Sequence, residues 1–367
     1  MHVGFGPLFQ NLGKPVPDHE VYARELEMAR AAEEMGFDSV WSVEHHFTDY
    51  TMVPDVVQFL SYMAGHTSRV QLGSMVVVLP WHDPIRVAEQ VAMLDAMSGG
   101  RMILGVGRGL GRVEFDGFRV PMDESRERFV ESAQMILTGL ERGYCEFEGN
   151  HVKQPRRDIR PAPFKTFKGR TFAAAVSPDS MPVMAQLGVG LLVIPQKPWD
   201  SVREDFAVYH RVWADTHGAE SAPPAPLCGG MFFVDESADR AEEMAYTYIG
   251  NYYHSVMNHY EMQAGHLGEK KGYEFYARLH DHIAKRSPDG AAADFVRLMP
   301  FGTPQQVIEK VEFIHETIGA RGVMAHFAYG GMPYDEANRN MRLFVDRVLP
   351  ELQRLGDQRG KLQVEAA

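Results

Sequence analysis

Three short segments of the chain carry side chains that suit chemistry on a small ligand. The first is Glu44-His45-His46, which follows a strand predicted over 38–43. An imidazole can move a proton near neutral pH, and a neighbouring carboxylate can tune it. Adjacent strand residues point to opposite faces, so we expect one imidazole to face a site and the other to face the surrounding layer. A metal held by both is therefore not predicted.

The other two segments suit an anion. Gly107-Arg108-Gly109 follows a strand predicted over 101–106, where glycine lets the backbone approach a ligand and guanidinium supplies a fixed charge. Ser177-Pro178-Asp179-Ser180 opens a helix predicted over 179–188, and such helix N-termini hold phosphate. Each segment alone could be only a turn or an ordinary helix cap. Because they follow successive strands, both could hold one phosphate.

The elements that position these segments alternate regularly between strand and helix. Strands are predicted over 3–8, 38–43, 70–79, 101–106, 171–176, 190–194, 227–234 and 322–328, with helices between them and a last helix over 335–354. Such alternation favours parallel pairing through right-handed crossovers. Eight strand–helix pairs predict an α/β protein with a (β/α)8 TIM barrel, whose active site lies at the C-terminal ends of the strands.

Two stretches interrupt this alternation and are predicted to be insertions, about 141–169 and about 251–300. The second is rich in Tyr, His and Lys, and we expect it to form a lid. Residues 1–367 are predicted to form one domain with a polar tail from about 355. The alternative, an open doubly wound sheet, would carry a G-x-G-x-x-G fingerprint after its first strand, and the chain has none there.

Composition excludes several classes of protein. Lys plus Arg number 37 against 49 Asp plus Glu, a net charge of −12, which disfavours a nucleic-acid or anionic-lipid partner. The 2 cysteines, Cys145 and Cys228, are too few for a disulfide framework or a thiolate metal site. No apolar run approaches the roughly 18 residues of a membrane span, and the first residues lack a signal peptide's features. We therefore expect a cytoplasmic protein.

Several aromatic and histidine residues are candidates for a substrate site. Trp81 and His82 follow the third predicted strand, and His326 lies near the end of the last. The spacing of His254, His259 and His266 is not that of a helical pair of metal ligands, so no metal is predicted there. The aromatic residues near the barrel mouth favour an apolar or ring-containing small molecule.

Five segments resemble the bacterial luciferase-like flavin-dependent monooxygenases, in the order of that family and over nearly the whole chain. They are Trp41 to Phe47, Leu104 to Gly109, Ser177 to Ser180, Phe301 to Pro304 and Gly330 to Pro333. The resemblance implies a TIM barrel that binds reduced flavin mononucleotide (FMN), reacts it with O2 to a C4a-peroxyflavin and oxygenates an organic substrate. It also implies a homodimer and a separate flavin reductase that uses NAD(P)H.

The same resemblance implies roles for individual residues. His45 would donate a proton or stabilise the oxygenating species, tuned by Glu44. Ser74, Met75 and Val76 would support the flavin ring, often through a bulge or an unusual peptide bond. Gly107, Arg108 and the segment Ser177, Pro178, Asp179 and Ser180 would surround the cofactor, with Arg108, Ser177 and Ser180 on its phosphate.

One departure from the family pattern bears on the substrate. Gly107 stands where the light-emitting luciferase subunit has a reactive cysteine, which argues against long-chain aldehyde chemistry and light emission. Two alternatives stay open: a deazaflavin-dependent hydride-transfer enzyme on the same barrel, and a non-catalytic flavin-binding subunit. Consumption of O2 would distinguish them.

Overall fold

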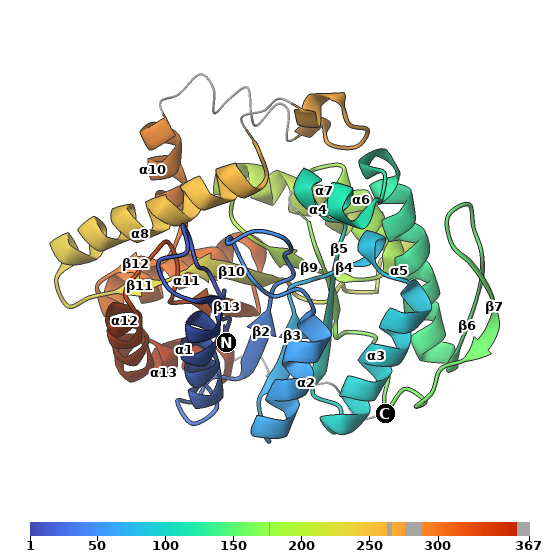
Figure 1. The fold of residues 1–367 in the computed structure, drawn as a ribbon, viewed down its shortest axis with the longest axis horizontal. Helices are drawn as coiled ribbons and strands as arrows, with labels where there is room; N and C mark the ends of the chain where they lie inside the picture. Colours follow the sequence, from blue (N-terminus) through green and yellow to red (C-terminus); the bar gives the residue numbers. More distant parts are fainter. Residues whose placement is uncertain (176, 263–265, 276–287, 358–367) are drawn as a thin grey trace.

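The computed structural model describes residues 1–175, 177–262, 266–275 and 288–357, and its centre is a closed barrel of eight parallel strands (Figure 1). The order around the barrel is β3-β2-β1-β13-β10-β9-β8-β5, and β5 pairs with β3 to close it. The predicted (β/α)8 architecture is thus confirmed. The strands are β1 (His2–Phe5), β2 (Ser39–Ser42), β3 (Gln71–Ser74), β5 (Met102–Gly107), β8 (Thr171–Ala174), β9 (Gly190–Val193), β10 (Leu227–Met231) and β13 (Gly322–His326).

Helices surround the barrel, and local capping chemistry fixes where several begin. Asp83 caps α3 by accepting from the backbone N–H of Ile85, and Thr303 and Gln306 form a reciprocal capping box on α11. Such caps satisfy N–H groups that lack a partner within the helix. The outer helices are α1 (Asp18–Ala31), α2 (Val56–His66), α3 (Pro84–Met97), α5 (Ser125–Arg142), α6 (Ser180–Leu187), α7 (Trp199–His217), α11 (Pro304–Ile318), α12 (Tyr334–Arg347) and α13 (Leu349–Asp357).

The third barrel strand is shorter than the sequence predicts. The run over 70–79 divides into β3 and β4 (Val77–Val78), followed by a 3-10 turn, η1 (Leu79–Trp81). Between the two strands, the Met75–Val76 peptide bond is cis. The family resemblance implies either a bulge or an unusual peptide bond in this segment. A short helix that the sequence did not indicate, α4 (Arg112–Phe118), follows β5.

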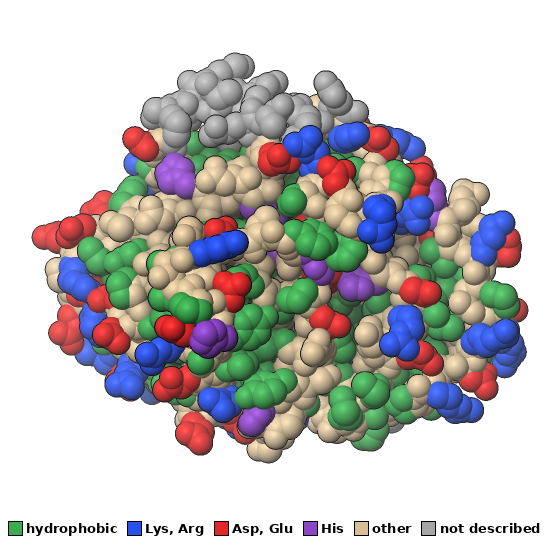
Figure 2. Space-filling view, in the orientation of Figure 1, with side chains coloured by type: hydrophobic (Ala, Val, Ile, Leu, Met, Phe, Trp, Pro, Cys, Tyr) green, Lys and Arg blue, Asp and Glu red, His purple; other side chains and the backbone are tan. Residues whose placement is uncertain are grey.

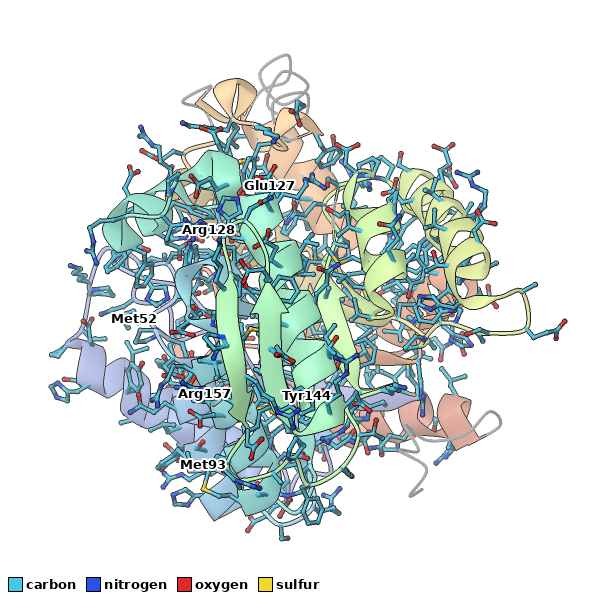
Figure 3. All side chains as sticks on the ribbon, turned by 90° about the vertical axis from the view of Figure 1, so that its right-hand side faces the viewer. Met52, Met93, Glu127, Arg128, Tyr144 and Arg157 are labelled. Atoms are coloured by element: carbon cyan, nitrogen blue, oxygen red, sulfur yellow. The ribbon has the colours of Figure 1, made fainter. Side chains whose placement is uncertain are left out.

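The first insertion is more ordered than predicted. Within 141–169 it forms an antiparallel hairpin of β6 (Tyr144–Glu148) and β7 (Lys153–Asp158). Figure 3 shows this hairpin lying along α5. The guanidinium of Arg156 stacks on the ring of Tyr144, 4.0 Å from its centroid. The hairpin was missed because its outward residues are mostly charged.

The second insertion also contains regular structure. Helix α8 (Ala238–His259) continues well past residue 251 and lies across the top of the barrel in Figure 1. Helix α10 (Pro288–Leu298) packs against it, and the short strands β11 (Phe233–Val234) and β12 (Phe301–Gly302) pair nearby. The rest of the predicted lid falls partly on 263–265 and 276–287, outside the described residues. The lid therefore stays a prediction.

The last predicted helix is divided in the structure, and the surface carries mixed charge. The helix predicted over 335–354 is two helices, and α13 runs to Asp357, so the first residues of the tail predicted from about 355 are helical; residues 358–367 lie outside the described residues. None of the described helices is both long and apolar enough to cross a bilayer. On the face shown in Figure 2, acidic and basic side chains are interspersed, so the net charge of −12 forms no single patch there.

Candidate active site

A cavity of about 260 Å³ lies at the C-terminal ends of the barrel strands. Its walls come from the loops after β2, β4 and β5, from the start of α6 and from the C-terminal half of α8. Most of the lining is apolar or aromatic, with a few acidic, basic and imidazole groups. This composition is typical of a small-molecule site.

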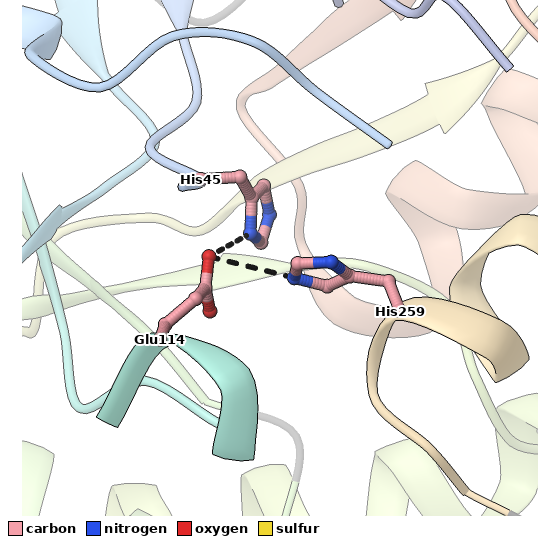
Figure 4. A group of neighbouring side chains, drawn as sticks. All are labelled: His45, Glu114 and His259. Carbon is pink, nitrogen blue, oxygen red and sulfur yellow. Dashed lines mark hydrogen bonds and ion pairs between the residues drawn. The ribbon is translucent and has the colours of Figure 1, made fainter. Parts of the chain in front are cut away.

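His45 lies at this cavity and is held by a carboxylate from another part of the chain (Figure 4). Its Nδ1 lies 3.0 Å from Oε1 of Glu114, and the backbone N–H of His46 donates to the same oxygen at 3.0 Å. The His45 side chain is 15% exposed and Glu114 is fully buried. Nε2 of His45 lies 3.4 Å from the hydroxyl of Tyr260. With Nδ1 directed at the carboxylate, Nε2 is the nitrogen left for a ligand.

Glu114 is ionised despite its burial. Burial raises the pKa of a carboxyl group, but the nearby charge of His45 and the contacts from His259 and His45 outweigh it and lower the pKa of Glu114 to about 2. A carboxylate that stays charged in this position stabilises a protonated imidazole beside it. The pair can therefore hold or release a proton at the cavity.

Glu44, which the sequence analysis assigned to tuning His45, has other partners. Its Oε1 contacts Nε2 of His46 at 3.1 Å and Nε2 of His82 at 2.7 Å, and its Oε2 accepts from the backbone N–H of Val78 at 2.9 Å. Burial raises the pKa of Glu44, but the hydrogen bonds from His46 and His82 bring it below its usual value. Among the described residues, the carboxylate beside His45 is thus Glu114, and Glu44 ties β4 to the loop after β2.

Glu114 reaches His45 because α4 is docked by its aromatic residues. The ring of Phe118 stands edge-on to His46, with centroids 4.6 Å apart, and Phe115 packs edge-on against Trp81 at 5.4 Å. These contacts fix α4 against the loop after β2 and the 3-10 turn after β4. The seven-residue helix is therefore positioned by packing rather than by its own stability.

A third member of the cluster comes from the end of α8. His259 has a side chain only 1% exposed, and its Nε2 lies 3.4 Å from Oε1 of Glu114. Its Nδ1 lies 2.9 Å from Oγ1 of Thr48. Burial lowers the pKa of His259, and the contact with Glu114 only partly opposes this. The Tyr50 ring stacks on its imidazole, with centroids 4.6 Å apart.

Two arginines lie at another part of the same cavity, where the sequence predicts an anion site. Arg108 and Arg126 both line it, and both donate to the carbonyl oxygen of Gly272, at 2.8 and 3.3 Å. Burial and the charge of Arg108 lower the pKa of Arg126. Two partly buried guanidinium groups this close repel each other, so the site favours an anionic ligand.

The start of α6 faces this pair of arginines. Ser180, the first residue of α6, lines the cavity, and its hydroxyl is 2.7 Å from that of Ser177, which is buried behind it. Pro178 and Asp179 are exposed, and the carbonyl of Asp179 accepts from Arg126 at 3.0 Å. The arrangement brings together Arg108, Arg126 and a helix N-terminus, which suits a phosphate.

The residues predicted to support a flavin ring divide into two groups. Met75, Val76 and Gly107 line the cavity. Ser74 is fully buried, and its hydroxyl donates to the carbonyl of Gly105 at 2.9 Å and accepts that residue's N–H at 2.8 Å. Ser74 therefore joins β3 to β5 through Gly105, whereas Met75 and Val76 form part of the cavity wall.

The predicted substrate residues are also separated by the structure. Trp81 lines the cavity and His326 closes it from below, with Nδ1 2.6 Å from the carbonyl of Gly6. Burial lowers the pKa of His326 to about 4, so it is neutral near pH 7. His82 instead lines a separate depression near the β6–β7 hairpin, beside His151.

Three residues of the site were missed by the sequence analysis: Glu114, Arg126 and His259. Arg126 could have been found, because it lies in the first turn of a predicted helix that starts beside the strand ends. His259 could have been found from the apolar residues that continue at helical spacing through Ile249, Tyr252 and Val256. Glu114 gave no such signal, because α4 is too short to show a period.

Comparisons with known proteins show the family to which the chain belongs. Residues 1–321 match the luciferase-like monooxygenase family. The alpha chain of alkanal monooxygenase from Photorhabdus luminescens is 27% identical over 336 residues, which cover 91% of this chain and 92% of that one.

Solved structures share the fold. A monooxygenase from Streptomyces bottropensis superposes with a TM-score of 0.79 at 24% identity, over 96% of this chain and 100% of that one. The oxygenating constituent of 3,6-diketocamphane monooxygenase from Pseudomonas putida, in complex with FMN, gives 0.71 at 18% identity, over 96% and 99%. An F420-dependent secondary alcohol dehydrogenase gives 0.69 at 15% identity, over 95% and 98%. The chain therefore belongs to the luciferase-like monooxygenase family, whose fold serves both flavin-dependent and F420-dependent enzymes.

Proposed function

We propose that this protein is a flavin-dependent monooxygenase that uses reduced FMN and O2 to oxygenate a small apolar or ring-containing substrate. One observation carries the proposal: a single cavity combines a paired-arginine anion site at Arg108 and Arg126 with a histidine–carboxylate pair at His45 and Glu114. The first can hold a phosphorylated cofactor, and the second can move a proton beside it.

The anion site fits the phosphate of FMN. Arg108 and Arg126 converge on the carbonyl of Gly272, and Ser180 presents a helix N-terminus to the same part of the cavity. A phosphate would relieve the repulsion between the two guanidinium groups and accept several charge-assisted hydrogen bonds. The ring of Tyr273 stacks on Arg108, 3.9 Å from its guanidinium carbon, and holds that side chain in place.

The wall beyond the arginines fits a flat aromatic ring. Met75 and Val76 supply apolar surface, and the missing side chain of Gly107 lets Val76 take its place in the wall, since a Cβ there would lie 2.3 Å from Cγ2 of Val76. When bound, reduced FMN supplies the electrons that activate O2. In this proposal a separate flavin reductase delivers those electrons from NAD(P)H, and the protein acts as a homodimer.

His45 moves the proton in this proposal. Glu114 holds Nδ1 of His45, which leaves Nε2 as the base or acid at the cavity, 3.4 Å from the hydroxyl of Tyr260. The apolar lining around it limits access by water and strengthens the interaction of the imidazole with charge that develops nearby.

The test is a comparison of cofactors. The purified protein is titrated with FMN, riboflavin and the deazaflavin F420, and O2 uptake is followed with a generic flavin reductase and a panel of ring-containing compounds. The proposal predicts that FMN binds more tightly than riboflavin and that substrate-dependent product appears only with O2. Oxygen-independent turnover with the deazaflavin would instead identify a hydride-transfer enzyme, and flavin binding without product would identify a non-catalytic subunit.

A further inference from the structure

His259 is a buried imidazole next to the reactive one, and it shares the same carboxylate. Its ring stands edge-on to that of His45, with centroids 4.9 Å apart, and its Nε2 approaches the oxygen of Glu114 that also holds His45 (Figure 4). We propose that His259 is a positioning residue for His45, which sets, through the shared Glu114 oxygen, how strongly His45 holds a proton.

The hydrogen bonds around His259 indicate which of its nitrogens carries the proton. Nε2 faces the Glu114 carboxylate, which can only accept, so the tautomer that suits this contact leaves Nδ1 free to accept from the hydroxyl of Thr48, 2.9 Å away. A neutral imidazole has one N–H, and an acceptor Nδ1 places that hydrogen on Nε2. Nε2 then carries its hydrogen beside Oε1 of Glu114, 3.4 Å away, at an ion-pair distance but without the geometry of a hydrogen bond.

Glu114 divides its negative charge among three neighbours. Oε1 accepts from the backbone of His46 and contacts both imidazoles, whereas Oε2 has no hydrogen-bond partner among the described residues. Each contact to Oε1 withdraws some of the charge that would otherwise act on His45. The contact from His259 therefore weakens the hold of Glu114 on a protonated His45.

The titratable groups that face this pair from other elements do not supply the same control. They are Asp49 and Tyr50 in the loop after β2, and Tyr252 and Tyr260 at the end of α8. Burial raises the pKa values of Tyr50 and Tyr252, so both are uncharged near pH 7. The rings of Tyr50 and Tyr260 contact both histidines, but among the described residues Glu114 is the carboxylate that contacts both.

A metal ion is the other occupant that two histidines and one carboxylate could hold, since their ligand atoms lie within 4.8 Å of one another. The hydrogen bonding disfavours it. Nδ1 of His45 lies 3.0 Å from Oε1 of Glu114, which also accepts the N–H of His46, so a metal bound through Nδ1 would have to displace the hydrogen shared between His45 and that oxygen. One proton on the two imidazoles also neutralises the single carboxylate without a metal.

Any effect of His259 on turnover rests on the proposed function. The NMR titration below does not, because it is carried out on the flavin-free protein. The histidines of the flavin-free protein are labelled with ¹⁵N and ¹³C, and the midpoint at which His45 titrates is measured by NMR in wild type, His259→Leu and His259→Gln. The leucine removes the polar ring beside Oε1 of Glu114, so we expect the midpoint to rise by about 0.5 to 1 pH unit, a three- to tenfold gain in proton affinity. The glutamine places an amide N–H beside the same oxygen, so it should restore most of the wild-type midpoint.

Two further variants provide a second test, should His259→Leu fail to fold, and a control. Thr48→Val removes the hydroxyl from Nδ1 of His259 and should shift the His45 midpoint in the same direction, even if His259→Leu fails to fold. His254→Leu, on the same helix, is the control and should leave it unchanged. An unchanged midpoint in both His259→Leu and Thr48→Val would overturn the proposal. So would one equivalent of tightly bound metal in the wild-type protein that His259→Leu abolishes.

Discussion

Nδ1 of His45 lies 3.0 Å from Oε1 of Glu114, which joins the loop after β2 to a seven-residue helix after β5. The contact is buried on the carboxylate side and open to the cavity on the imidazole side. It therefore orients one nitrogen of His45 and leaves the other for chemistry. The proton-transfer role proposed for His45 depends on this contact, and the two predictions that follow test it.

Replacing His45 by alanine should separate cofactor binding from oxygenation. The anion site at Arg108 and Arg126 is unchanged in His45→Ala, so we expect FMN affinity to stay within several-fold of wild type. Product formed per reduced flavin consumed should fall at least about tenfold, because a positioned acid or base contributes 10²–10⁴ to such steps. The assay compares product with peroxide released. Unchanged coupling would remove His45 from the mechanism.

Two buried carboxylates near the cavity should behave differently when neutralised. Glu114→Gln keeps an acceptor for His45 but removes the charge, so we expect product per flavin to fall about 10- to 100-fold. Glu44→Gln acts on His46 and His82 instead, and should reduce thermal stability with a smaller effect on coupling. If Glu44→Gln uncouples the reaction more than Glu114→Gln does, the assignment of these two carboxylates is wrong.

The two arginines should contribute to FMN affinity through its phosphate. Arg108→Ala and Arg126→Ala are each expected to weaken FMN by about tenfold or more while changing riboflavin affinity much less, because charge-assisted hydrogen bonds contribute about 1.5–3 kcal/mol each. Arg128→Ala is the matched control, since this arginine pairs with Glu124 on the same helix. Fluorescence titration measures both ligands. Equal losses for FMN and riboflavin would place these arginines away from the phosphate.

The wall at Gly107 should tolerate a side chain only if Val76 is reduced. A Cβ at Gly107 would lie 2.3 Å from Cγ2 of Val76, and overpacking of this kind costs about 1–3 kcal/mol. We expect Gly107→Ala to lower both the melting temperature and FMN affinity, and the double variant Gly107→Ala/Val76→Ala to recover most of the loss. Val76→Ala alone is the reference. A double variant no better than Gly107→Ala would show that the clash is relieved elsewhere.

Stability should depend on pH through Glu33, which caps the segment before β3. Burial raises the pKa of Glu33, but hydrogen bonds from the backbones of Val70, Arg69 and Ser68 together outweigh it and lower the pKa to about 2. Because this pKa is below the unfolded value of 4.5, the stabilisation is fully present above about pH 4.5 and is lost as pH falls toward 2.

Urea unfolding of Glu33→Gln tests this directly. Between pH 5 and 3 the wild-type midpoint should fall more steeply than that of Glu33→Gln, because the amide cannot gain a proton. Glu34→Gln, at the exposed neighbouring position, should follow the wild type. Parallel curves for wild type and Glu33→Gln would contradict the expected contribution.

The barrel could be predicted from the sequence because its strands are buried on both faces and are read as short apolar runs between amphipathic helices. The predicted bounds were too long where a loop is also apolar, as at 75–76, since burial in the cavity wall and burial in a strand look alike in the sequence. The hairpin over 144–158 was missed for the opposite reason, because its exposed strands are mostly polar.

The site was only partly predictable, for a related reason. His45, Arg108 and Ser180 directly follow strands or begin helices, so their place at the barrel mouth follows from topology. Glu114 and His259 reach it through packing of α4 and through the length of α8, and neither is fixed by local sequence. Glu44 was assigned to His45 because the two are adjacent in sequence, whereas the carboxylate in contact is 69 residues away.

The most direct test of the proposed function is isotope incorporation. Reduced FMN from a generic reductase, ¹⁸O2 and a panel of apolar ring-containing compounds are supplied to the protein, and products are analysed by mass spectrometry. We predict that one atom of ¹⁸O enters the product, that incorporation requires the protein, and that it largely disappears in His45→Ala. Turnover of the same compounds with a deazaflavin in the absence of O2, with no ¹⁸O in any product, would contradict the proposal.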